Sequence, residues 1–375
     1  MLKRVSVSRR LRQRGLSLVE LMVSIVIGLL ILAGVVQVVF TSKATFLAQE
    51  DMSYIQENAR YAMSVLGTDI RGAGYWGCTS ANPRTANVVE ITDTTAAGQD
   101  AEMLVGSVGI QGFSDSTAQF PVVATDNYTR WPLPGSGHET ESFIVRYAAG
   151  TPWGVVNDSS VDSFMQVQGA VNDPEFELGD FLVATAADCK SIGIFHAAGQ
   201  TGGELGGLKV QTISYATGGL NCTSRIKLGV SDKSMTCAAP LPGGTTLYEP
   251  GSTLTKFLAH GYFIESSDVL QGQPALKRKV LTSTGSSRKE EIAVGVEDML
   301  LMYGVQTGNN VQYKAADEVL ATEWASVVSV QVNLLFRSQS QSLPQASNNN
   351  YLGNVYSDRY LRQVVTSTFK LRNRT

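Results

Sequence analysis

Glu20 has the most unusual chemical setting of any residue in this sequence, because it is an acid inside a long apolar segment. It is the one ionisable residue between Leu16 and Ser42. A carboxylate within a bilayer costs about 2.5–3.5 kcal/mol on insertion scales, and more in other estimates. Glu20 therefore either lies near the lipid headgroups, where the cost is small, or awaits a positively charged partner.

The segment around Glu20 has the length of a membrane span. Residues 21–40 are predominantly apolar, and as a helix they would extend over about 30 Å, the thickness of the hydrocarbon layer. Basic residues flanking a span stay in the cytoplasm, so we expect residues after about 42 to face the other side of the membrane. The upstream basic residues, which no acid accompanies, are Lys3, Arg4, Arg9, Arg10, Arg12 and Arg14.

Gly15 is a small residue placed before the apolar run, whereas an ordinary secretory signal is cleaved after it. Hydropathy and charge alone favour an uncleaved signal anchor. Glu20 favours cleavage after Gly15, because the new amine on Leu16 would be a cation at a similar depth in the membrane. Helix geometry makes that contact poor within one chain and good between adjacent staggered chains. The sequence therefore predicts cleavage between Gly15 and Leu16.

The segment from Arg12 to Ser24 resembles the class III signal of type IV pilins and type II secretion pseudopilins. It reads Arg-Gln-Arg-Gly followed by Leu-Ser-Leu-Val-Glu-Leu-Met-Val-Ser, where the family usually has Phe or Met in place of Leu16. The resemblance implies that a prepilin peptidase cuts after Gly15 and methylates the amine of Leu16. It also implies that Glu20 helps to dock subunits.

An apolar stripe at helical spacing continues beyond the membrane segment. It predicts one helix over about residues 16–70, roughly 80 Å long, whose second half packs on a globular domain. We expect Gly67, Gly72 and Gly74 to end this helix. Gly28 and Gly34 lie inside the span, where they either allow close packing or let the helix loosen on assembly. The stripe consists of Ala48, Met52, Ile55, Ala59, Ala62 and Leu66.

After residue 75 the pattern changes to short alternating runs separated by Gly, Asn, Asp and Ser. It predicts antiparallel sheets packed on the long helix, an α+β fold. We expect little regular structure near residues 80–140, 150–178, 198–206, 215–255 and 338–358. The predicted strands are 142–148, 180–185, 208–214, 258–265, 291–296, 299–305, 328–336 and 361–371.

Four cysteines suit an exported domain with two disulfides, for which three pairings are possible. We favour Cys222–Cys237, which closes a short loop, together with Cys78–Cys189, which would tie the end of the helix to the sheet. A bridge closing a 15-residue loop stabilises by about 3 kcal/mol in the chain-entropy model.

Other potentially reactive side chains do not form a recognisable catalytic or metal-binding pattern. His138, His196 and His260 are scattered, and the tryptophans at 76, 131, 153 and 324 are typical of core or loop anchors, with sugar stacking as the alternative. Asp173, Glu175, Asp317 and Glu318 lack EF-hand spacing. Residues 16–375 carry 24 basic and 33 acidic side chains, which argues against nucleic-acid binding. We predict a protein that is not an enzyme and has no metal or cofactor.

Four further segments resemble PilW-type minor pilins: residues 71–78, 258–264, 296–305 and 371–375. The resemblance implies a subunit that joins other minor pilins in an initiation complex, primes polymerisation of the major pilin, and sits at the fibre tip beside an adhesin. A J-type pseudopilin of type II secretion is the alternative. The expected parts are a cleaved leader (1–15), a membrane and assembly helix (16–42), an amphipathic helix (43–72) and a periplasmic domain (73–375).

Overall fold

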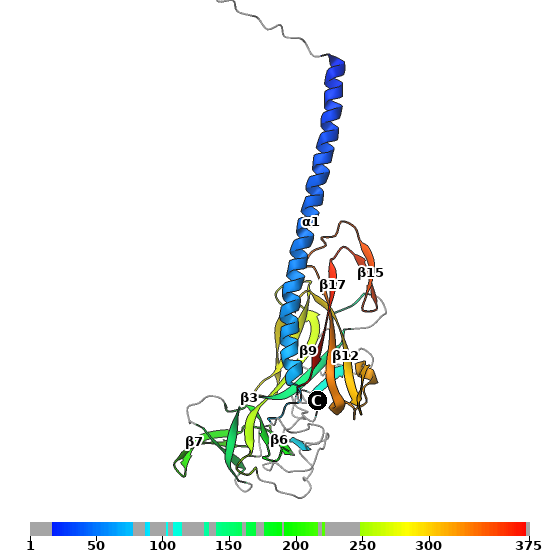
Figure 1. Cartoon of the computed structure of the whole chain (residues 1–375). Coiled ribbons are helices and arrows are strands. Elements are labelled where there is room, and N and C mark those ends of the chain that lie inside the picture. The colour runs from blue at the N-terminus through cyan, green and yellow to red at the C-terminus, as the bar shows by residue number, and fades with distance from the viewer. Residues whose placement is uncertain are drawn as a thin grey trace, which may run out of the picture.

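The computed structural model describes residues 17–77, 87–90, 103, 108–114, 131–134, 140–159, 163–169, 176–189, 191–216, 220–221 and 248–372. It consists of one long helix, α1 (Leu18–Gly72), whose second half is packed on β-sheets. The first half of the helix stands clear of the domain (Figure 1). This arrangement confirms the predicted α+β fold.

Helix α1 contains 55 residues and is therefore roughly 80 Å long. Its predicted end near residue 70 is confirmed to within two residues. Gly74 follows in the left-handed region with a φ of 74°, a conformation that glycine adopts without steric cost. The prediction that Gly67 helps to end the helix is wrong, because Gly67 lies inside the last turns and packs against the ring of Phe369.

The second half of α1 buries one face against the domain. The predicted stripe residues Ile55, Ala59, Ala62 and Leu66 are buried, whereas Ala48 and Met52 are half-buried at the edge of the domain. The helix packs most extensively against β3 (Ser142–Ser159), β11 (Ser287–Val294), β14 (Val327–Arg337) and β17 (Arg362–Lys370).

A four-stranded antiparallel sheet packs against the second half of α1. Its strands lie in the order β13 (Asn310–Lys314), β12 (Val296–Thr307), β14 and β17. Strand β14 has the alternation that predicted it, since Val330, Val332 and Leu334 are buried while Gln331 and Asn333 are half-buried. Two single turns of 3-10 helix, Ala316–Glu318 and Trp324–Ser326, connect β13 to β14.

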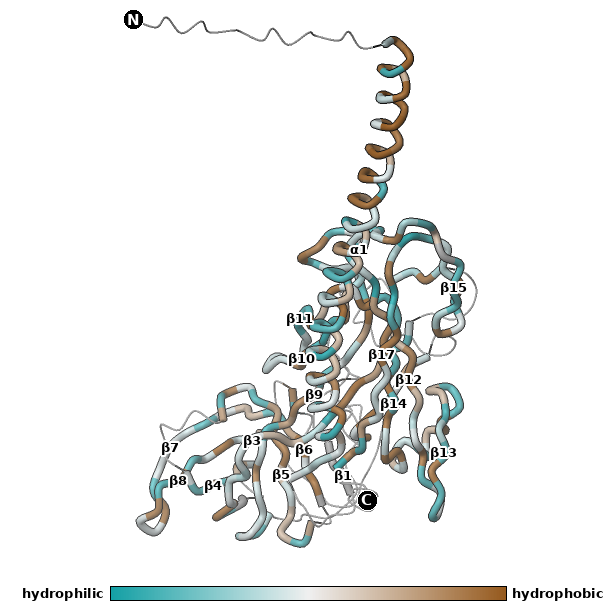
Figure 2. Tube along the Cα trace, turned by 45° about the horizontal axis from the view of Figure 1, so that its top comes forward, coloured by the Kyte–Doolittle hydropathy of each residue, from teal (hydrophilic) through white to brown (hydrophobic). Residues whose placement is uncertain are grey.

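In the part of the chain that the structure describes, the larger sheet has eleven strands and extends away from the free N-terminal half of the helix (Figures 1 and 2). Its path is β1-β6-β5-β9-β3-β4-β8-β7, with β2 paired to β3, and β10 pairing both β9 and β11. The long strand β9 pairs with β3, β5 and β10. It therefore connects the strands beside α1 to the part of the sheet that lies farther from the helix. The remaining bounds are β1 (Asn87–Glu90), β2 (Ile110–Phe113), β4 (Phe164–Gln168), β5 (Phe181–Thr185), β6 (Ser191–His196), β7 (Gly199–Leu205), β8 (Leu208–Ser214), β9 (Thr253–Ser266) and β10 (Pro274–Leu281).

Strands β15 (Ser347–Tyr351) and β16 (Asn354–Asp358) form a separate two-stranded sheet. Both lie in a stretch where we expected little regular structure, and so do β1, β2, β4, β7 and the second half of β3. Those predictions are wrong for two reasons. Strands β7 and β15 are polar and mostly exposed, so backbone pairing rather than apolar alternation holds them. Strand β4 and the second half of β3 have only short apolar patterns among polar residues, yet they bury Met165, Val167, Trp153 and Val155. The single strand predicted at 291–296 is also wrong, because Gly295 separates β11 from β12 at a φ of 85°.

Adding one methyl group at Gly67 is expected to strain the contact between α1 and β17. A Cβ atom there would lie 2.6 Å from Cε1 of Phe369. Overpacking costs about 1–3 kcal/mol, and the gain in helix propensity offsets up to about 1 kcal/mol of it. We expect Gly67→Ala to lower the free energy of unfolding by about 1–2 kcal/mol, measured by urea unfolding of the purified protein.

Gly28→Ala is the matched control for this substitution, because a Cβ at Gly28 has no atom within 4 Å. It should leave the unfolding midpoint of the domain unchanged. Equal stability of the Gly67→Ala variant and the wild type would contradict the tight contact.

Candidate assembly interface

The first half of α1 presents an apolar surface that the described part of the chain leaves uncovered. The large apolar side chains from Leu18 to Phe40 are between 43% and 74% exposed. This part of the helix is long and apolar enough to cross a membrane. Figure 2 shows that hydrophobic residues predominate along this half of the helix until it reaches the domain. The surface is therefore available to lipid or to apolar helices of other chains.

Glu20 lies in the first turn of α1 and is exposed. The hydroxyl of Ser24 donates a hydrogen bond of 2.7 Å to the backbone carbonyl of Glu20, which leaves the carboxylate itself free to face outward. Lys43 is the nearest basic residue along the described helix, and 23 residues of helix separate the two by about 35 Å. Gly15 and Leu16, the predicted cleavage site, lie outside the described residues.

Gly28 and Gly34 have no packing role within this chain's fold, but they would affect how closely a neighbouring helix can pack. The helix is continuous through both positions, and a Cβ built at either has no atom within 4 Å. Nothing in the described chain therefore requires glycine there. Small residues let a second helix approach closely within a membrane.

Asp69 holds the other end of α1 in the domain. Its carboxylate is 5% exposed and accepts hydrogen bonds from the hydroxyls of Tyr147 on β3 (2.9 Å) and Tyr262 on β9. Nδ1 of His260 lies 2.6 Å from its Oδ2 atom, and Nη1 of Arg278 lies 3.9 Å away. One helical carboxylate thus fastens α1 to β3, β9 and β10.

The pKa of Asp69 reflects these contacts. Burial alone would raise it, but the hydrogen bonds from His260, Tyr262 and Tyr147 and the charge on His260 outweigh burial and hold the pKa below its ordinary value. Burial and the nearby negative charge of Asp69 raise the pKa of both tyrosines, so they stay protonated and act as donors.

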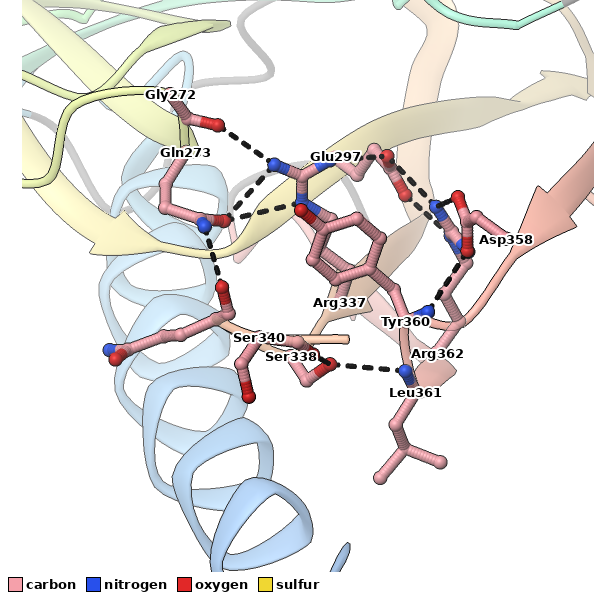
Figure 3. Close-up of polar contacts among 11 residues, drawn as sticks. Gly272, Gln273, Glu297, Arg337, Ser338, Ser340, Asp358, Tyr360, Leu361 and Arg362 are labelled. Atoms are coloured by element: carbon pink, nitrogen blue, oxygen red, sulfur yellow. Dashed lines mark hydrogen bonds and ion pairs between the residues drawn. The ribbon is translucent and has the colours of Figure 1, made fainter. Parts of the chain in front are cut away.

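Glu297 on β12 is the centre of a second buried polar cluster (Figure 3). Its carboxylate is bonded by Nε of Arg362 at 2.7 Å and by Nη1 of Arg337 at 3.2 Å. Arg362 also makes a bidentate pair with Asp358, at 2.6 and 2.8 Å, and this pair holds the pKa of Asp358 below its ordinary range. The cluster therefore ties β12, β14, β16 and β17 together.

The guanidinium groups of this cluster are also stacked on aromatic rings. Arg362 lies 4.2 Å from the ring centroid of Tyr356, and Arg337 lies 4.5 Å from that of Tyr360. Nη2 of Arg337 donates to the backbone carbonyl of Gly272 at 2.9 Å, which adds the turn between β9 and β10. Arginine suits such a site because its planar fork can pair and stack at once.

The four segments that resemble PilW-type proteins lie on elements that surround the end of α1. Arg71 accepts a backbone hydrogen bond from Arg372 at 3.1 Å and stacks on Phe369. Trp76 is buried and stacks on Phe257 of β9. Residues 258–264 belong to β9, and residues 296–305 belong to β12, which carries Glu297. Much of the resemblance therefore lies in residues that hold the end of α1 against the domain.

Cys189 is disulfide-bonded. It lies in the turn between β5 and β6, in the left-handed region with a φ of 60°. Cys78, Cys222 and Cys237 lie outside the described residues, so the predicted pairs Cys78–Cys189 and Cys222–Cys237 remain predictions.

The other candidate side chains have structural contacts where they are described. Nε2 of His196 lies 2.9 Å from the carbonyl of Ser283, and burial lowers the pKa of the ring. The carboxylate of Glu318 accepts a bond from the backbone of Ala315 at 3.1 Å. Trp153 and Trp324 are buried like Trp76, whereas Trp131 stacks on Arg337. His138, Asp173 and Glu175 lie outside the described residues.

Comparison with known proteins gives two family matches. The model described as Type IV Pilus-assembly protein W matches residues 261–373, and the model of the prokaryotic N-terminal methylation motif matches residues 10–36. Among solved structures, a type IV-like pilin from Thermus thermophilus is similar at 14% identity and a TM-score of 0.22, covering 32% of this chain and 69% of that one. No curated protein matches the chain.

The exposed apolar helix, the β domain built on its second half and the methylation motif together define the class of the type IV pilins. Within this class, residues 261–373 are similar to Type IV Pilus-assembly protein W, and this similarity supports a minor pilin of the PilW type. Proteins of these families are structural components of the pilus rather than enzymes.

Sequence reasoning missed the roles of Asp69 and Glu297. A signal for Asp69 was present, because the predicted stripe steps by 3 and 4 residues and its next position after Leu66 is 69. A charged residue at a core-facing position indicates a buried partner. For Glu297 the sequence offers no such signal, since Arg337 and Arg362 lie 40 and 65 residues away.

Proposed function

We propose that this pilin primes pilus assembly as part of a complex of minor pilins that begins the fibre and ends at its tip. The observation that carries the proposal is the uncovered apolar half of α1. In a membrane this surface is solvated by lipid. A subunit that leaves the membrane for a fibre must cover the same surface with other apolar helices, because exposing it to water is unfavourable in proportion to its area.

Glu20 gives this association a direction. Cleavage after Gly15 would place the amine of Leu16 at the start of the helix, and in a staggered pair of chains that cation faces the Glu20 carboxylate of its neighbour. Pairing the two removes the cost of an isolated charge in an apolar setting. The PilW match favours a role in the pilus over one as a pseudopilin of a secretion system.

The proposed division of the chain follows from this role. Residues 1–15 form a cytoplasmic leader that is removed, and residues 16–42 span the inner membrane and later pack in the fibre. Residues 43–72 seat the domain on the helix, and residues 73–375 form the periplasmic domain. The partners would be the prepilin peptidase, other minor pilins, the major pilin and, at the tip, an adhesin.

Replacing Glu20 with alanine is expected to leave the protein in the membrane but to impair its incorporation. Loss of the ion pair should reduce the number of pili per cell by at least about tenfold in a strain that has only the variant gene, since each 1.4 kcal/mol is a factor of ten. Pili are counted by electron microscopy, and the variant is quantified in membrane fractions.

Glu50→Ala is the matched control, because Glu50 is an exposed acid on the same helix beyond the apolar segment. It should preserve the number of pili. Normal pilus numbers in the Glu20→Ala strain, with normal amounts of the other minor pilins, would rule out the proposed role of the carboxylate.

A bulky residue at position 15 should block processing. In the Gly15→Leu variant we expect the full leader to be retained, whereas the wild type should begin at methylated Leu16. Intact mass and N-terminal peptide mapping distinguish the two, with Ser8→Ala as a control that should be processed normally. A wild-type chain that begins anywhere other than Leu16 would refute the cleavage site.

A further inference from the structure

The hairpin β15–β16 is a small sheet whose two edges are both free of backbone partners among the described residues. It belongs to neither larger sheet. Isolated two-stranded hairpins are at best marginally stable in water, so something else must hold this one. Its inner side supplies that support, because Asn354 and Tyr356 are each 1% exposed.

The Glu297 cluster fixes the base of this hairpin. Asp358, the last residue of β16, is held by both arms of the Arg362 guanidinium, and Tyr356 lies under the same group. Nearby, the backbone of Leu343 donates to the carbonyl of Arg359 at 3.0 Å. The buried charges thus hold a rigid hairpin against the domain while its outer side stays in solvent.

The turn of the hairpin determines which backbone groups point outward. Leu352 and Gly353 have φ values of 50° and 95°, which is the two-residue turn that closes on a hydrogen-bonded pair, Tyr351 and Asn354. Hydrogen-bonded and non-bonded pairs alternate along an antiparallel ladder. The outward N–H and C=O groups are therefore those of Asn348, Asn350, Val355 and Ser357.

These edges have none of the features that normally block strand pairing. Proteins protect exposed edges with proline, charged side chains or bulges. The four outward residues are uncharged, none is proline, and the register of the hairpin is regular from end to end. Val355 is 57% exposed, so an apolar side chain is presented beside the free backbone groups.

The position of the hairpin indicates its partner. Both views place β15 at the end of the domain from which the apolar half of α1 emerges (Figures 1 and 2). Chains whose apolar helices pack side by side bring their domains together at this level. The partner is therefore the domain of the adjacent pilin rather than a molecule at the far end of the subunit.

We infer that the β15–β16 hairpin is a docking edge that accepts an extended strand from the domain of a neighbouring, different pilin. Main-chain hydrogen bonds supply the attraction, as in other complexes formed by strand addition. The inference rests on the proposed function, because it needs neighbouring pilins that pack through α1. It adds a second contact outside the membrane helix.

Proline substitution tests this edge with little change to the hairpin itself. The double variant Asn348→Pro/Val355→Pro removes one outward N–H from each edge, where proline is tolerated because that N–H has no partner within the hairpin. The double variant Asn348→Ala/Val355→Ala keeps both N–H groups and is the matched control. Full-length protein in detergent is used to capture the other minor pilins from membranes, which are quantified by mass spectrometry.

We expect the alanine variant to recover other pilins like the wild type and the proline variant to recover about tenfold less, the effect of losing one or two net hydrogen bonds. Equal recovery with proline and alanine would overturn the docking edge. A wild-type chain that recovers no pilins would instead refute the proposed function. If the purified wild type alone forms dimers that the proline variant does not, the partner is a second copy and the inference is wrong.

A charged substitution at the edge of the hairpin tests the same docking edge without requiring that the strand tolerate proline. Val355→Lys keeps the backbone N–H but places a hydrated ammonium beside it, a substitution that natural edges use against pairing. It should reduce recovery of pilins in the same direction, with an unchanged melting temperature. Wild-type recovery by this variant would count against the edge as well.

Discussion

Replacing Asp69 with alanine is expected to lower the free energy of unfolding by about 3–5 kcal/mol, the usual cost of removing one partner from a buried charged cluster. The substitution leaves the hydroxyls of Tyr147 and Tyr262 and Nδ1 of His260 without their acceptor in a site that excludes water. It also releases the end of α1 from β3 and β9. Urea unfolding of the purified protein measures the loss.

Thr68→Ala is the control for this prediction, because Thr68 is the exposed neighbour of Asp69 and bonds only to the carbonyl of Ser64 within the same helix. It should change stability by less than about 0.5 kcal/mol. A similar small change in Asp69→Ala would contradict the view that this carboxylate fastens the helix to the sheet.

The pH dependence of the same contact has a defined sign. The pKa of Asp69 in the folded protein is below its ordinary value of about 3.9. Its contribution is therefore complete above pH of about 4 to 5 and is lost as the pH falls through the folded pKa. The stability difference between wild type and Asp69→Asn should shrink on acidification, and a difference that grows below pH 4 would contradict the assignment.

Replacing Glu297 with alanine is the second substitution with a large expected effect. The carboxylate is 3% exposed and lies between two guanidinium groups that are themselves more than nine-tenths buried. Without it, both buried guanidinium groups lose a carboxylate partner, and Arg362 keeps its pair with Asp358. We expect a loss of about 3–5 kcal/mol in the free energy of unfolding.

The partly exposed pair of Arg278 and Glu290 supplies the comparison for Glu297. These side chains are 24% and 28% exposed, and such pairs contribute about 0–1 kcal/mol. Glu290→Gln should therefore have a small effect in the same unfolding experiment. If Glu297→Ala costs no more than Glu290→Gln, the buried cluster does not hold β12, β16 and β17 together.

The elements with strong periodicity were predictable from the sequence. The long helix follows from an apolar run joined to a stripe at spacings of 3 and 4, and β14 follows from strict alternation between Val330 and Leu334. Hydrophobic patterning sets both, so the sequence alone was enough. Two of the strands that it did not predict, β7 and β15, are exposed and polar, and each is held by hydrogen bonds to the strand that follows it across a two-residue turn.

The candidate site divides in the same way. Glu20 was identified because a charge within an apolar span is visible in any sequence. The contacts that hold the end of the helix in the domain were not identified. Asp69 is separated from its partners Tyr147, His260 and Tyr262 by 78 to 193 residues in the sequence. No local pattern records contacts of that range, and only the fold brings them together.

The central claim is that the apolar half of α1 is the main surface through which this pilin joins others. It is tested most directly by comparing the full-length protein in detergent with a chain of residues 45–375 that is exported by a separate signal, each used to recover other pilins from membranes. The account predicts that the shorter chain recovers less than about a tenth of the pilins that the full-length protein recovers. Equal recovery by the two chains would contradict it.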